Sequence, residues 1–248
     1  MKGLIVAVGE KDSISRDRTS EIRGLSEYAS MPVVKHILMS FDKIGVNETL
    51  LLVNPNHKRQ YEQALSGYNG VRLEETRIPS SDVTFSYIDG FGRLGTGDHI
   101  IASPDDCLFT FSLEGLMSRF NGIADTGMGV MAVRNKVHIQ DDNFAESNYG
   151  WCTVDKAGRF TEVKSSFHDK NKPWPENRAF VTLDLSIIHK DMICSLLKDI
   201  QKPNIQGEQL IRKYSTQFYA WVINEGAWFD IGKPSSRKKA EEYFSSLH

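Results

Sequence analysis

Asp105 and Asp106 are two adjacent carboxylates that follow the mainly apolar run 99–103 after a single proline, Pro104. Such a run is typical of a buried strand, and an open α/β sheet binds its ligands at the carboxyl ends of its strands. Carboxylates at that edge suit Mg²⁺, which binds a few of them together with phosphate oxygens. A helix N-cap or a solvated turn would explain the same pair equally well, so the magnesium interpretation needs support from other segments.

A long cationic segment follows the first apolar run of the chain. Residues 3–9 are apolar and closed by a glycine, which is typical of a strand buried on both faces of a parallel sheet. The polar segment 10–24 then carries Lys11, Arg16, Arg18 and Arg23. Its cations and backbone N–H groups, together with the helix that follows, suit a phosphate. The alternative interpretation is a solvated loop without a ligand.

Bulk composition restricts the classes of partner. The chain has 248 residues and a net charge of −2, so no global basic field indicates nucleic acid or an anionic membrane. Its three cysteines are far apart and odd in number, which favours a reducing compartment over a disulfide framework. The first residues enter a strand without a signal-peptide pattern, and no apolar run is long enough to span a bilayer. We therefore expect a cytoplasmic protein with no nucleic-acid or membrane partner.

Apolar periodicity predicts that strands and helices alternate in the first half, as in a doubly wound sheet. The predicted strands are 3–9, 49–53, 71–75, 99–103 and 128–133, and the predicted helices are 31–44, 57–65, 83–94 and 112–120. Strand 71–75 is expected at a sheet edge. Gly90 and Gly92 predict that the helix 83–94 is weak.

Short strands around turns are predicted after about residue 135. The second half is expected to contain a hairpin of 150–154 with 159–163, a strand 179–183, helices 185–200 and 206–214, a hairpin of 218–223 with 227–231, and a terminal helix 235–247. The predicted fold class is α/β and Rossmann-like: a mainly parallel mixed sheet flanked by helices, with an antiparallel β insertion in the second half. We expect a single domain.

The order of these motifs resembles the sugar-phosphate nucleotidylyltransferases, also called nucleoside-diphosphate-sugar pyrophosphorylases. The resemblance covers nearly the whole chain. Segment 7–9 matches the start of the family's opening motif A-x-G-x-G-T-R-L, and 148–150 resembles the Y-G before its hairpin. Segment 177–184 resembles N-A-G-I-Y-V-F-D, and 228–234 closely resembles W-x-D-I-G-T-P.

The resemblance implies a set of site residues. Asp105 and Asp230 would hold Mg²⁺, and the catalytic cations would be Arg23, Arg16 and Lys164. The implied nucleotide-binding residues are Val8, Gly9, Glu10, Lys11, Ser80, Ser81 and Asp105. The implied substrate-binding residues are Tyr149, Gly150, Glu162, Lys164 and Asn177. Residues 1–134 would form the nucleotide-binding half and residues 135–248 the sugar-phosphate-binding half.

The opening motif also departs from the family. Its catalytic arginine falls on Ser13, and its second glycine and threonine fall on Lys11 and Asp12. Lys11 and Asp12 would crowd the approach of the backbone to a triphosphate. Loss of such a cation commonly costs several kcal/mol of barrier, unless another one such as Arg16 or Arg18 supplies the charge.

The implied reaction is in-line attack of a sugar 1-phosphate oxygen on the α-phosphorus of a nucleoside triphosphate, with release of pyrophosphate. Catalysis of such a reaction consists mainly of positioning the reacting phosphates and neutralising their charge. The implied partners are thus a nucleoside triphosphate and a sugar phosphate. The sequence leaves the oligomeric state open and is compatible with a homo-oligomer. One alternative is a catalytically impaired regulatory subunit that binds a nucleotide or nucleotide-sugar. The other is a glycosyltransferase, for which a D-x-D pair is expected instead of adjacent aspartates.

Overall fold

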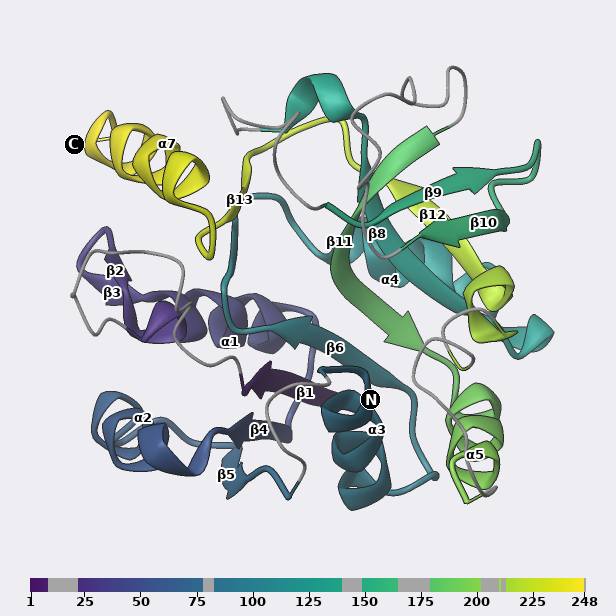
Figure 1. Ribbon diagram of the computed structural model, residues 1–248, viewed down its shortest axis with the longest axis horizontal. Helices are drawn as coiled ribbons and strands as arrows, with labels where there is room; N and C mark the ends of the chain where they lie inside the picture. The colour runs from purple at the N-terminus through teal and green to yellow at the C-terminus, as the bar shows by residue number, and fades with distance from the viewer. Residues whose placement is uncertain are drawn as a thin grey trace.

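The computed structural model describes residues 1–8, 22–77, 83–139, 149–164, 179–201, 210 and 213–247. Its central sheet has the strand order β10-β9-β11-β6-β1-β4-β5, and β8 and β12 extend it beside β11 (Figure 1). The strands of the parallel part are β1 (Lys2–Ala7), β4 (Thr49–Val53), β5 (Val71–Glu75) and β6 (Ile100–Pro104). The remaining strands are β8 (Gly129–Arg134), β9 (Trp151–Val154), β10 (Phe160–Lys164), β11 (Ala179–Ile188) and β12 (Phe218–Val222).

Helices cover both faces of this sheet. The helices are α1 (Val33–Lys43), α2 (Lys58–Ala64), α3 (Val83–Leu94), α4 (Glu114–Asn121), α5 (Lys190–Asp199) and α7 (Pro234–Ser245). Alternate residues of β1 point to opposite faces, so Ile5 packs in the core with α1 while Leu4 packs in the core with α3 and α5. Burial on both faces explains why β1 reads as a continuous apolar run. The predicted mixed α/β fold class is confirmed.

Short strands and 3-10 turns complete the fold. Two small sheets pair β2 (Glu27–Tyr28) with β3 (Met31–Pro32) and β7 (Cys107–Phe109) with β13 (Trp228–Asp230). The 3-10 turns are η1 (Arg23–Leu25), η2 (Pro55–His57), η3 (Ala124–Thr126), η4 (Lys136–His138) and η6 (Ser215–Gln217). In the described part of the chain, no helix is long and apolar enough to cross a membrane.

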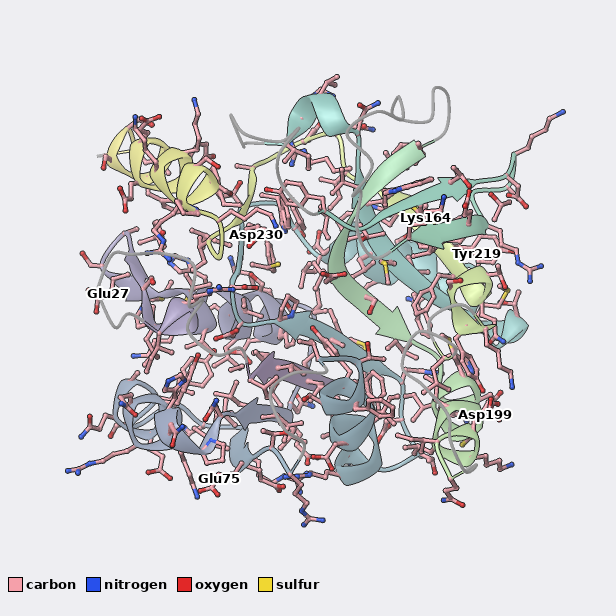
Figure 2. All side chains as sticks on the ribbon, viewed as in Figure 1. Glu27, Glu75, Lys164, Asp199, Tyr219 and Asp230 are labelled. Atoms are coloured by element: carbon pink, nitrogen blue, oxygen red, sulfur yellow. The ribbon has the colours of Figure 1, made fainter. Side chains whose placement is uncertain are left out.

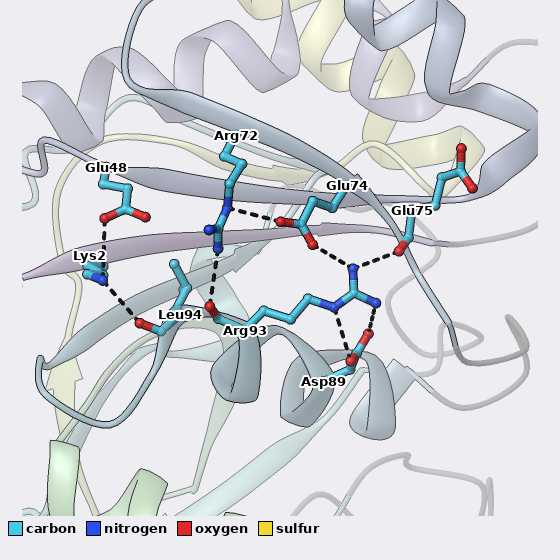
Figure 3. Close-up of polar contacts among 8 residues, drawn as sticks. All are labelled: Lys2, Glu48, Arg72, Glu74, Glu75, Asp89, Arg93 and Leu94. Carbon is cyan, nitrogen blue, oxygen red and sulfur yellow. Dashed lines mark hydrogen bonds and ion pairs between the residues drawn. The ribbon is translucent and has the colours of Figure 1, made fainter.

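Strand β5 lies at the predicted edge of the sheet, where charged side chains fasten it to α3. The Arg93 guanidinium binds Glu74 on β5 at 2.8 Å and Asp89 on α3 at 2.6 Å (Figure 3). Arg72 on β5 also binds Glu74, at 3.1 Å. Charged side chains on an edge strand disfavour pairing with a further strand, so this network protects the edge as well as anchoring α3.

Two predictions for the second half are wrong. Residues 185–188 continue strand β11, where Ile187 pairs with Ile101 of β6 and Val130 of β8, so the predicted helix begins only at Lys190. The predicted hairpin 218–231 does not form, because β12 pairs in parallel with β8 and β13 pairs with β7. Both errors followed local sequence patterns, whereas the observed structure of these segments depends on pairing with strands that are distant in the sequence. The predicted helix 206–214 lies mostly outside the described residues, and the division at residue 134 stays a prediction.

Candidate active site

A cavity of about 290 Å³ lies at the carboxyl ends of β1 and β6, where the sequence predicted a ligand site. The first half contributes Val8, Arg23 and the segment 104–107 to its wall. The second half contributes Tyr149, Gly150, Thr182, Asp184, Trp228, Asp230 and Lys233. Residues more than a hundred positions apart in the chain therefore meet in one cavity.

Asp106 and Asp230 are brought together by the pairing of β7 with β13. Asp230 lies opposite Cys107, and the Ile231 N–H donates to the Asp106 carbonyl at 3.0 Å. Their carboxylates converge over Gly232, where an added Cβ would lie 2.9 Å from Asp230 Oδ1 and 3.0 Å from Asp106 Oδ2. The nearest atom to that Cβ position is Arg23 Nη1, at 2.7 Å, so glycine at 232 leaves room for both carboxylates and for the Arg23 guanidinium.

Burial and like charges disfavour the ionised form of Asp106. Burial, followed by the nearby carboxylates of Asp230 and Asp105, raises the pKa of Asp106 to about 7 against the opposing effect of Arg23. A site that concentrates carboxylates in this way is stabilised by a bound divalent cation.

The contacts of Asp105 differ from those of Asp106, although the resemblance implied that Asp105 and Asp230 hold the metal together. The Asp105 carboxylate accepts a hydrogen bond from the buried hydroxyl of Tyr61, and a side chain at Gly24 would collide with both groups. Burial raises the pKa of Asp105, whereas the Tyr61 hydrogen bond and Arg23 lower it. The structure therefore places Asp106, rather than Asp105, beside Asp230, while Asp105 connects the turn before β7 to α2 and η1.

Two cations of the cavity are held by these carboxylates. The guanidinium of Arg23 lies 3.2 Å from Asp106 Oδ2. The Lys233 ammonium lies 2.8 Å from Asp230 Oδ2 and 4.1 Å from the centroid of the Tyr149 ring. The structure brings Arg23 to the site as predicted, and it adds Lys233.

Asp184 occupies an irregular point in β11. Its φ of 54° is left-handed, and the register of β11 against β8 shifts between Thr182 and Ser186. This bulge directs the Asp184 side chain into the cavity, where it remains accessible to solvent. Partial enclosure by the protein, followed by the Asp230 carboxylate, raises its pKa to about 6 against the opposing effect of Lys233.

A second cavity of about 440 Å³ adjoins the first and shares Val83, Gly150, Thr182 and Asp184 with it. Its other described walls are mostly apolar side chains from α3, α5 and the second half of the sheet. Lys164 lines this second cavity, where its ammonium lies 3.2 Å from Glu162 and 5.1 Å from the Trp151 ring. Figure 2 shows Asp230 beside the turn before α7 and Lys164 on the side of β9 and β10.

The predicted site residues thus divide into three groups. Val8, Arg23, Asp105, Tyr149, Gly150 and Asp230 line the first cavity, and Lys164 with its partner Glu162 belongs to the second. The predictions for Gly9, Glu10, Lys11, Arg16, Ser80, Ser81 and Asn177 lie outside the described residues, as do those for Ser13 and Arg18. Sequence reasoning missed Tyr61, Asp184 and Lys233. Two of these had a signal: Lys233 follows Asp230 by three positions in the recognised segment 228–234, and Asp184 ends the recognised segment 177–184.

Neither a protein-family model nor a curated protein matches the sequence. Solved structures do match the chain. A structure from Bacillus anthracis, described as a glucose-1-phosphate thymidylyltransferase in complex with sucrose, matches with a TM-score of 0.78 and 13% identity over 100% of this chain and 96% of that one. The inositol-1-phosphate CTP transferase from T. maritima gives a TM-score of 0.74 at 15% identity, over 99% of this chain and 95% of that one.

The chain has the fold of the sugar-phosphate nucleotidylyltransferases. HddC from Yersinia pseudotuberculosis also shares this fold, with a TM-score of 0.70 and 14% identity over 98% of this chain and 99% of that one. The resemblance drawn from the sequence is therefore confirmed at the level of the fold.

Proposed function

We propose that this protein is a metal-dependent nucleotidylyltransferase. It transfers a nucleoside monophosphate from a nucleoside triphosphate to a sugar 1-phosphate or a similar small phosphorylated acceptor. An acceptor phosphate oxygen forms a bond to the α-phosphorus while the bond from that phosphorus to the β-phosphate oxygen breaks, which releases pyrophosphate. The observation that carries the proposal is the pair of Asp106 and Asp230, flanked by Arg23 and Lys233 at the ligand edge of a nucleotidylyltransferase-fold sheet.

The residues present fit a divalent cation. Two carboxylates converge on the space left by Gly232, and their mutual repulsion is relieved when a cation binds between them. Asp106 and Asp230 would hold Mg²⁺, with Asp106 in the role that the sequence resemblance gave to Asp105. The metal, when bound, would neutralise phosphate charge and orient the reacting phosphates.

The chain's own residues account for the remaining roles. Arg23 presents a planar fork that suits a phosphate oxygen at the end of β1, where the triphosphate is expected. Gly150 lies on the wall shared by the two cavities, so the acceptor phosphate would lie near it and the rest of the acceptor would extend into the second cavity. Lys164 on that wall is a candidate contact for the acceptor.

Pyrophosphate release tests the proposal. The purified protein is incubated with Mg²⁺, each of the four common nucleoside triphosphates and a panel of sugar 1-phosphates and other small phosphorylated acceptors. We expect release with one triphosphate and acceptor, and loss of release on removal of Mg²⁺. The proposal is contradicted if no triphosphate reacts and none binds.

One observation favours the impaired nucleotide-binding subunit as a second candidate. Both cations that line the described part of the first cavity are already paired with carboxylates, which limits the charge free to stabilise a transition state. Tight Mg²⁺-dependent nucleotide binding without pyrophosphate release, across the whole acceptor panel, would support this candidate over the enzyme.

A further inference from the structure

Lys233 lies between two groups that can each hold its ammonium. Asp230 Oδ2 is 2.8 Å from Nζ, and the Tyr149 ring centroid is 4.1 Å away on the wall of the same cavity. The ring is 4% exposed and packs against Trp228 at a centroid distance of 5.9 Å, so it is a fixed surface. A cation near such a ring remains favoured even when its carboxylate partner is lost.

The backbone around Lys233 is held by hydrogen bonds to Asp230, whereas its ammonium stands at the end of a flexible stem. The Lys233 N–H donates to the Asp230 carbonyl at 3.0 Å, and the Gly232 N–H donates to Asp230 Oδ1 at 3.0 Å. Asp230 thus has one neutral, immobile donor and one charged donor on a flexible four-carbon stem. A divalent cation arriving at this carboxylate would repel the ammonium and leave the backbone donor in place.

The charge of the cavity explains why such an exchange matters. Its described lining contains four carboxylates, Asp105, Asp106, Asp184 and Asp230, against the cations Arg23 and Lys233. This lining would repel a phosphate as long as Arg23 and Lys233 are paired with carboxylates. A divalent cation held by Asp106 and Asp230 would offset this excess of negative charge, and it would also release an ammonium that can bind a phosphate.

We propose that Lys233 exchanges partners during the reaction cycle: it pairs with Asp230 before the metal binds, and it binds a substrate phosphate oxygen afterwards. This inference rests on the proposed function, and it assigns Lys233 two effects of opposite sign. The residue competes with the metal for Asp230 and strengthens phosphate binding once the metal is in place.

The substitution Lys233→Met tests both effects, because methionine keeps much of the apolar stem and removes the charge. In the full-length protein, we expect Mn²⁺, measured by calorimetric titration, to bind about three- to tenfold more tightly to the variant. Pyrophosphate added together with saturating Mn²⁺ is expected to bind about tenfold more weakly. Lys233→Arg should restore pyrophosphate binding. Lys238→Met is the matched control, since Lys238 lies on α7, the helix that Lys233 precedes, and its side chain is 74% exposed.

Equal or weaker Mn²⁺ affinity in a folded Lys233→Met variant would overturn the inference, as would unchanged pyrophosphate affinity. A merely structural role for Lys233 would lower thermal stability without tightening Mn²⁺ binding. If the wild-type protein binds both Mn²⁺ and pyrophosphate while Lys233→Met matches it, the inference fails and the proposed function stands. If the wild-type protein binds neither probe nor any triphosphate, both fail.

Discussion

At the residue scale, the neighbouring aspartates of one tight turn make different contacts. Asp105 is held by Tyr61 and lies against Gly24, whereas Asp106 faces Asp230 and Arg23. The sequence could identify an acidic pair after a strand, but the direction of each side chain depends on where β7 begins and which strand it pairs with. That pairing joins residues 107–109 to 228–230, which local patterns do not encode.

Substitutions at the two positions should therefore differ. Asp106→Asn removes a carboxylate oxygen beside Asp230 and is expected to weaken Mn²⁺ binding at least about tenfold. Asp105→Asn should leave Mn²⁺ affinity within about threefold while lowering the free energy of unfolding by roughly 1–2 kcal/mol, because Tyr61 loses a charged acceptor. Calorimetric titration and urea unfolding measure the two effects. If Asp105→Asn weakens Mn²⁺ binding more than Asp106→Asn does, then Asp105 rather than Asp106 holds the metal.

The pH dependence of the metal-free protein follows from Asp106. Its pKa of about 7 in the folded protein exceeds its unfolded value, so the folded state binds more protons between the two pKa values. Stability therefore falls as pH rises through that window, from about pH 4 to about pH 7. Thermal melts of the wild-type protein and Asp106→Asn should show this decline reduced in the variant. Mn²⁺ affinity should change in the opposite direction and weaken as pH falls below about 7, because protons compete for Asp106.

At the element scale, α3 shows why a glycine that weakens a helix in isolation can be required in the fold. Gly90 packs directly on β1 and β4, where an added Cβ would lie 2.6 Å from Leu4 Cδ1 and 3.1 Å from Leu52 Cδ1. Both leucines are fully buried and cannot move aside. The sequence predicted the bounds of α3 correctly, but only the packing explains Gly90.

The pair Gly90→Ala and Gly92→Ala separates packing from helix propensity. Gly90→Ala is expected to destabilise by about 1–2 kcal/mol, since overpacking against the leucines exceeds the gain in helix propensity. At Gly92, an added Cβ meets only Leu197 at 3.6 Å, an ordinary contact. Gly92→Ala should therefore stabilise by about 0.5–1 kcal/mol. Urea unfolding of both variants checks the signs; destabilisation of equal size at both positions would contradict this account.

Sequence patterns predicted best those elements that are buried along a whole face. Strand 49–53 and helix 83–94 were predicted with the observed bounds, because an apolar run or stripe is set by burial alone. Residues 185–188 were misassigned because an apolar run before a helix fits either state. Their place in β11 is decided by hydrogen bonds to β6 and β8, which lie far away in the sequence.

At the scale of the whole molecule, the candidate site exists only because the two halves of the chain meet. Arg23 and Asp106 come from the first half, whereas Tyr149, Asp230 and Lys233 come from the second. The pairing of β7 with β13 joins them, and the sheet itself continues from β6 into β11. The fold class could be predicted from the sequence, whereas the composition of the cavity required the tertiary pairing.

The central claim is that Asp106 and Asp230 form the metal and phosphate centre of a nucleotidylyltransferase. Mg²⁺-dependent pyrophosphate release by the wild-type protein and by Asp106→Asn, Asp230→Asn and Asp105→Asn tests it most directly. We expect release by the wild-type protein and by Asp105→Asn, and a loss of at least about a hundredfold in the other two variants. Release that survives both Asp106→Asn and Asp230→Asn would contradict the claim.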